Sequence, residues 1–115
     1  MTVMDLGNPS RLFGSPRRTS VLVLLGLLEE SYPSELAVLL GARLFAVQTI
    51  LDSLESDGII VTRRLGNTRR VQLNPRYVGY QELRALLWKL GEHDVEIQKA
   101  AARKRARPRR KGKPG

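Results

Sequence analysis

The hydrophobic pattern of the chain changes its period at Gly58, and this change restricts the folds that the chain can adopt. Before Gly58, apolar residues recur three and four positions apart, which is the spacing of one face of an α-helix. After it, residues 59–62 are all β-branched, and residues 69–73 alternate polar and apolar side chains as a half-buried strand does. Gly66-Asn67 lies between these runs and is a two-residue hairpin signal, because glycine readily adopts a positive φ. The sequence therefore predicts a mainly α fold with a small β-hairpin.

Three helices are predicted before the hairpin. The first begins at Ser15-Pro16, since serine caps helix N-termini and proline suits the first helical position, and it ends near Glu30. The second covers about residues 34–40 and stops at a glycine, and the third covers about residues 44–56. The side chains predicted to face the core are Val21, Leu24, Leu25, Leu28, Leu36, Leu39, Leu40, Val47, Ile50, Leu51 and Leu54.

Further helical segments follow the hairpin. Leucines at helical spacing predict a fourth helix up to Gly91, which ends or kinks it, and residues 94–107 can continue as a helix before Pro108. The predicted organisation is an N-terminal arm (residues 1–14), a folded domain (15–90), a helical extension (91–107) and a basic disordered tail (108–115).

Positive charge gathers at the end of the chain. The 115 residues carry a formal net charge of +9, yet basic and acidic residues are equal in number up to Gln98. The cationic end is expected to bind nucleic-acid phosphates without reading sequence, although a disordered solubilising end, RNA or an acidic protein fits the same charge. The predicted phosphate contacts are Arg103, Lys104, Arg105, Arg107, Arg109, Arg110, Lys111 and Lys113.

The residues that most enzymes and metal sites require are scarce in this sequence. It contains no cysteine, a single histidine (His93), no phosphate-binding glycine loop and no HExxH motif. We therefore expect no enzyme, no metal site and no cofactor. No run approaches the roughly 20 apolar residues that span a bilayer, so we expect no membrane association and a cytoplasmic, nucleoid-associated protein.

A family resemblance rests on the residues between the second helix and the hairpin. Leu36-Ala37 precedes the turn residue Gly41, and Val47, Leu51 and Leu54 follow at core spacing before Gly58-Ile59-Ile60. From Phe13 to Leu90 the chain resembles the ArsR/MarR-like winged helix-turn-helix transcription regulators. The resemblance implies a winged helix-turn-helix fold and sequence-specific binding of double-stranded DNA, as a repressor or an activator, most simply a repressor.

The resemblance also implies which residues face the DNA at the start of the recognition helix: Arg43, Phe45, Ala46, Gln48 and Thr49. Gln48 can pair bidentately with adenine, Thr49 can meet a base or a phosphate, and Arg43 can take guanine or a phosphate. Phe45 can pack on a thymine methyl group, finish the core or meet a partner protein. The helix then continues with acidic residues, where basic ones would favour phosphate.

The hairpin corresponds to the wing of that family. Arg63, Arg64, Arg69 and Arg70 flank its turn, and Asn67 and Thr68 lie at its tip. These arginines are predicted to bond phosphates or enter the minor groove. The alternative is a charged, exposed ribbon that blocks edge-to-edge pairing.

A homodimer is also expected, because it would place two recognition helices on half-sites about 34–36 Å apart. Its predicted interface consists of Leu83, Leu87, Trp88, Leu90 and Ile97. A different function remains open: an interaction module that docks a protein through the recognition-helix face and binds nucleic acid non-specifically through its tail. A general nucleoid-coating protein is a third hypothesis.

Overall fold

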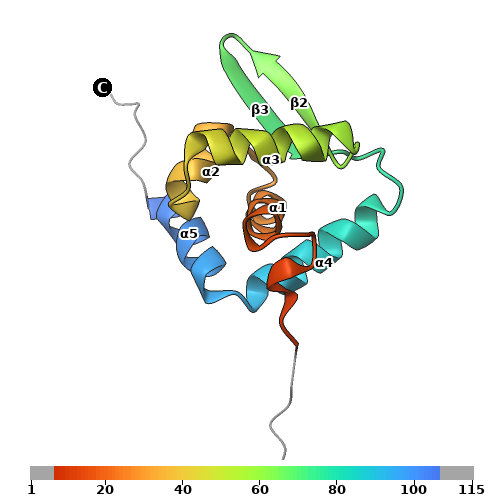
Figure 1. Cartoon of the computed structure of the whole chain (residues 1–115), viewed down its shortest axis with the longest axis vertical. Helices are drawn as coiled ribbons and strands as arrows, with labels where there is room; N and C mark the ends of the chain where they lie inside the picture. The colour runs from red at the N-terminus through yellow and green to blue at the C-terminus, as the bar shows by residue number, and fades with distance from the viewer. Residues whose placement is uncertain (1–6, 107–115) are drawn as a thin grey trace, which may run out of the picture.

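Helix α1 (Pro16–Leu28) lies at the centre of the fold, with other helices arranged around it (Figure 1). In the computed structural model, which describes residues 7–106, Ser15 caps this helix by accepting a hydrogen bond from the Arg18 N–H at 3.1 Å. Every residue from Val21 to Gly26 is buried, so the helix is covered on all sides rather than along one stripe. The predicted cap is confirmed, and the helix ends two residues before the predicted Glu30.

Helices α2 (Pro33–Leu40) and α3 (Leu44–Ser56) pack together across a short turn. Gly41 ends α2 with φ +62°, a left-handed conformation that glycine adopts without steric cost. The predicted bounds of α3 are confirmed, and α2 begins one residue earlier than predicted because Pro33 occupies its first turn.

The sheet is antiparallel and has three strands in the order β1-β3-β2. Strand β2 (Ile60–Leu65) and strand β3 (Thr68–Leu73) form the predicted hairpin, which projects past α3 (Figure 1). Strand β1 (Glu30–Ser31) was expected to be helix end and turn, and that expectation is wrong. Two residues are too few to show an alternating pattern, and only backbone pairing with β3 makes them a strand.

Helix α4 (Tyr80–Glu92) crosses α1 closely, and glycines permit the approach. A Cβ atom added at Gly26 would lie 2.8 Å from Leu87 Cβ, and one added at Gly91 would lie 2.8 Å from Leu27 Cδ1. Gly91 is the penultimate residue of α4 and faces α1, so the helix ends one residue beyond the predicted Gly91.

Helix α5 (Val95–Ala106) belongs to the core. Asp94 Oδ1 accepts a hydrogen bond from the Ile97 N–H at 3.1 Å, and Ile97, Ala100 and Ala101 are buried against α1, α2 and α4. The described part of the predicted extension, residues 91–106, is thus packed into the fold where an appended segment was expected. The predicted arm also contributes, since a 3-10 turn (Pro9–Arg11) packs on α1.

The architecture is mainly helical with one small antiparallel sheet. Within residues 7–106, no helix combines the length and the apolar character needed to cross a bilayer. The predictions made for residues 1–6 and 107–115, including the disordered tail and the phosphate contacts of Arg107, Arg109, Arg110, Lys111 and Lys113, lie outside the described residues.

Candidate nucleic-acid interface

A groove of about 650 Å³ separates the starts of α2 and α3 from the hairpin, and we call it the α3–hairpin groove. Residues of α2, α3 and the hairpin line this groove together, although the α2 and hairpin residues are more than twenty positions apart in the sequence. Its lining includes six of the eleven residues predicted to contact DNA: Gln48, Arg64, Asn67, Thr68, Arg69 and Arg70. The remaining lining residues are Tyr32, Pro33, Ser34 and Leu44.

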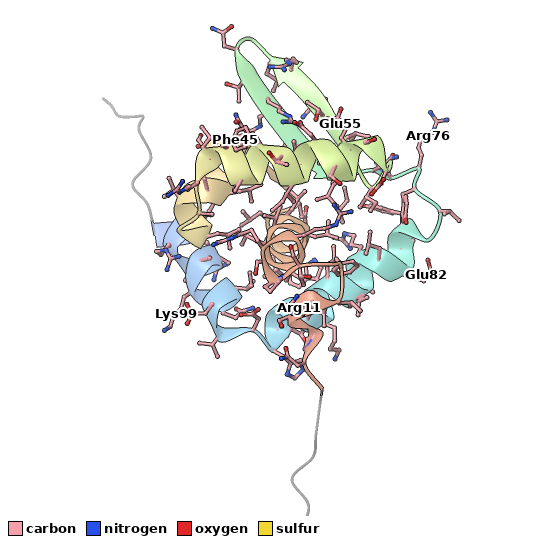
Figure 2. The ribbon with its side chains drawn as sticks, viewed as in Figure 1. Arg11, Phe45, Glu55, Arg76, Glu82 and Lys99 are labelled. Atoms are coloured by element: carbon pink, nitrogen blue, oxygen red, sulfur yellow. The ribbon has the colours of Figure 1, made fainter. Side chains whose placement is uncertain are left out.

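The first two turns of α3 present a face to solvent next to this groove. Phe45 is 78% exposed, and Arg43 and Thr49 are also exposed. Ala46 and Gln48 are half-buried. Phe45 lies at the α2 end of the helix and Glu55 at the other end (Figure 2). Because the core side of α3 carries Val47, Leu51 and Leu54, all fully buried, the outward face is fixed by packing.

The hairpin divides its four arginines between two surfaces. Arg64 is opposite Arg69 in the strand register, and Arg63 is opposite Arg70. Directly opposite residues share a face of the sheet, so each pair points to its own side. Arg69 binds acids of α3, so the first pair lies on the face toward α3, and Arg63 and Arg70 bind Glu30 of β1, so the second pair lies on the face that carries Glu30.

Arg69 is bound to α3 and only 16% of its side chain is exposed. Its guanidinium lies 3.1 Å from Asp52 and 3.0 Å from Glu55, and Thr62 donates a hydrogen bond to the same Glu55 oxygen at 3.0 Å. The acids on α3 that seemed unsuited to phosphate therefore hold the hairpin against the helix. Asp57 plays a similar part at the end of α3, where it pairs with Arg18 of α1 at 3.1 Å.

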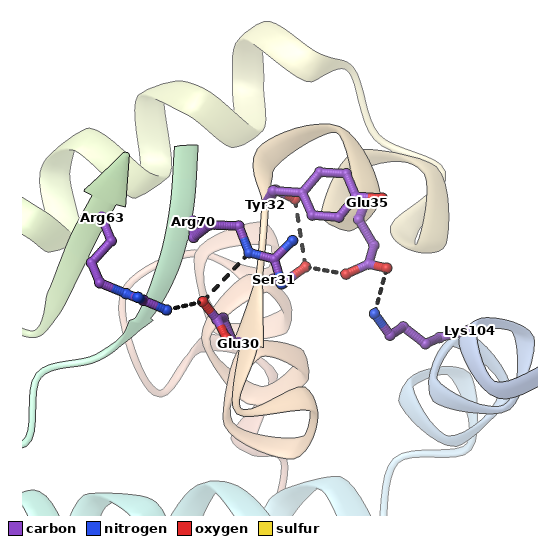
Figure 3. A network of polar contacts seen from close by, with 7 residues as sticks. All are labelled: Glu30, Ser31, Tyr32, Glu35, Arg63, Arg70 and Lys104. Atoms are coloured by element: carbon purple, nitrogen blue, oxygen red, sulfur yellow. Dashed lines mark hydrogen bonds and ion pairs between the residues drawn. The ribbon is translucent and has the colours of Figure 1, made fainter. Parts of the chain in front are cut away.

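Glu30 of β1 holds the other pair of arginines (Figure 3). Arg63 approaches its carboxylate at 2.8 Å and Arg70 at 3.4 Å, and the Arg70 guanidinium lies 5.4 Å from the centroid of the Tyr32 ring. The hydrogen bond from Arg63, followed by that from Arg70, lowers the pKa of Glu30 below its ordinary value although partial desolvation opposes them. The four arginines are therefore not equally available to a ligand: within the described part of the chain, Arg64 alone of the four has no side-chain partner.

A second carboxylate, Glu35 of α2, binds the end of α5 (Figure 3). It is 5% exposed, accepts a hydrogen bond from the Ser31 hydroxyl at 2.6 Å, and lies 2.7 Å from Lys104 Nζ. Arg103 donates to the carbonyl oxygen of Leu39. Arg103 and Lys104 were expected to contact phosphate as part of the cationic end; in the structure both bind α2 and fasten α5 to it. Arg105 is exposed at the end of α5.

The predicted dimer residues divide by burial. Leu87 and Ile97 are 0% and 1% exposed and lie in the core of this chain, so they do not form a surface for a second copy. Leu83 and Leu90 are partly buried against the same core, whereas Trp88 is 40% exposed. The homodimer itself stays a prediction.

His93 is exposed at the C-terminal end of α4 and does not line the α3–hairpin groove. Residues 7–106 hold no group of three or more His, Cys, Asp or Glu side chains that could bind a metal ion. Comparisons of the chain with protein-family models, with curated proteins and with solved structures found no match.

Proposed function

We propose that the protein is a winged helix-turn-helix regulator that binds double-stranded DNA in a sequence-specific manner. The observation that carries this proposal is the α3–hairpin groove, where an exposed helix face and a basic hairpin lie side by side. The order of helices and strands, α1-β1-α2-α3-β2-β3, agrees with a winged helix-turn-helix in which α3 is the recognition helix and the hairpin the wing.

The proposed binding mode places α3 in the major groove. That groove is about 12 Å wide and admits one α-helix. Gln48 and Thr49 offer hydrogen-bonding groups to base edges, and the side chain of Gln48 has the bidentate geometry that suits adenine. The hairpin beside the helix is then close to the sugar-phosphate backbone. Contacts to this backbone fix the position and orientation of a base-reading helix on the duplex.

The charges of this region favour a phosphate-bearing ligand. Arg43 and Arg64 are exposed and have no side-chain partner within residues 7–106. Arg63 and Arg70 are held by a carboxylate that is only partly buried, so a phosphate oxygen can take its place. Arg69, held by two acids, positions the hairpin instead. The basic residues beyond α5 would add affinity that falls with salt.

Selection from random duplexes at about 0.15 M salt tests the proposal. The full chain is used because α5 is part of the core, and truncation after residue 98 would remove two thirds of this helix. We expect the wild-type protein to enrich a common motif. The double variant Gln48→Ala/Thr49→Ala should lose that motif, while Arg11→Ala, at the opposite side of the molecule (Figure 2), should keep it. Retention of the same motif by the double variant, or enrichment of no motif by the wild type, would overturn the proposal.

A further inference from the structure

The exposed ring of Phe45 has no role in the fold. Its side chain is 78% exposed in the first turn of a helix whose core positions are otherwise filled by fully buried aliphatic residues. An aromatic ring left in water forgoes the stabilisation that burial would give, so the chain gains nothing from it in isolation. A ligand that covers the ring would supply that stabilisation.

The neighbours of Phe45 on the outward face are neutral. Gln48 and Thr49 follow it by three and four positions, which places all three on adjoining turns of the same face. No acid lies in the first turn of α3, and its first acidic residue is Asp52. Unpaired Arg43 and Arg64 flank the face. A neutral, partly apolar strip between free cations is complementary to base edges flanked by phosphates.

We infer that Phe45 is a specificity-determining residue that packs against the C5-methyl group of thymine in the major groove; this inference rests on the proposed function. The thymine methyl is the apolar group that a base pair presents there, and apolar side chains read it by contact. Phe45 and Gln48 are separated by about 4.5 Å along the helix axis, against about 3.4 Å between successive base pairs. The ring can therefore meet a thymine at a step adjacent to the base that Gln48 reads.

Replacing thymine by deoxyuridine tests the inference, because uracil lacks only the methyl group. The probe is the duplex pool retained by the wild-type protein, synthesised once with thymine and once with deoxyuridine. Burial of one methyl group is worth about a fourfold difference in affinity, so wild type should prefer the thymine pool by about that factor. Phe45→Ala should bind both pools equally, whereas Thr49→Ser, which removes the methyl group of Thr49 and keeps its hydroxyl, should keep the preference.

The outcomes separate the inference from the function on which it rests. Sequence-selective binding with equal affinity for both pools, or a thymine preference that survives in Phe45→Ala, overturns the role of Phe45 and leaves the DNA-binding proposal standing. Loss of the preference in Thr49→Ser but not in Phe45→Ala assigns the methyl contact to Thr49. Failure of the wild-type protein to select any duplex overturns both proposals and favours a protein partner for the ring.

Discussion

Glu30 and Glu35 lie five residues apart in one polar cluster, and each forms an ion pair with a basic side chain from a distant part of the chain (Figure 3). They differ in burial. The side chain of Glu30 is 31% exposed and faces the hairpin, whereas that of Glu35 is 5% exposed and faces α5. The same chemical pairing therefore occurs once at the surface and once inside the fold.

Burial decides what each carboxylate does. An exposed ion pair gains little net free energy, because water and salt screen it, so phosphate can displace Glu30 at small cost. A buried carboxylate that loses its cation keeps the full cost of desolvation. We conclude that Glu35 and Lys104 stabilise the fold, while Glu30 restrains two arginines that would contact phosphate under the proposed function.

Removal of the buried cation should have the largest effect. In Lys104→Met, Glu35 keeps only the Ser31 hydroxyl, and we expect the free energy of unfolding to fall by roughly 2 kcal/mol, less than for a fully buried pair because Lys104 is partly exposed. Urea denaturation measures the change. Lys99→Met is the matched control: its ammonium lies 3.9 Å from Glu96 on the exposed side of α5, and its removal should change stability by less than about 0.5 kcal/mol. Equal effects of the two variants would contradict the distinction between the pairs.

Neutralising the exposed carboxylate should instead change DNA binding. Glu30→Gln frees Arg63 and Arg70, and we expect affinity for duplex DNA at about 0.1 M salt to rise roughly three- to tenfold. Fluorescence anisotropy over a salt series measures both affinity and its salt dependence, which should steepen. Glu82→Gln removes the same charge from α4, away from the hairpin (Figure 2), and should change affinity by less than about twofold. An equal rise in both variants would mean that net charge alone acts.

The sequence predicted α2, which carries Glu35, and the hairpin, which carries the partners of Glu30, but it predicted neither strand β1 nor the ion pairs themselves. Periodicity and glycines located α2, α3 and the turn of the hairpin to within about one residue, because local patterns determine such bounds, whereas β2 runs three residues beyond the predicted 59–62. The pairing of Glu30 with Arg63 and Arg70 spans more than thirty positions, and a count of charges along the chain does not show which cations are neutralised in space.

Lys104 was assigned to the tail because it stands in a run of basic residues. One signal pointed the other way: Glu35 precedes Leu39 by four positions and so shares the core side of α2. An acid at a core position requires a cation or a hydrogen-bond donor. The sequence alone does not name that donor.

The smallest expected effect concerns the pH dependence of stability, and it sharpens the difference between the two carboxylates. The hydrogen bond from Arg63 places the pKa of Glu30 below its ordinary value of 4.5. A carboxylate with a lowered pKa stabilises the folded state above the unfolded-state pKa and loses that contribution as pH falls through the folded-state pKa. Glu30→Gln lacks the contribution at every pH. The difference in urea midpoint between wild type and variant should therefore be constant above about pH 5 and should close on acidification below 4.5. A difference that persists unchanged to about pH 3 would show that the variant acts through packing or backbone pairing of β1 rather than through the ionised carboxylate.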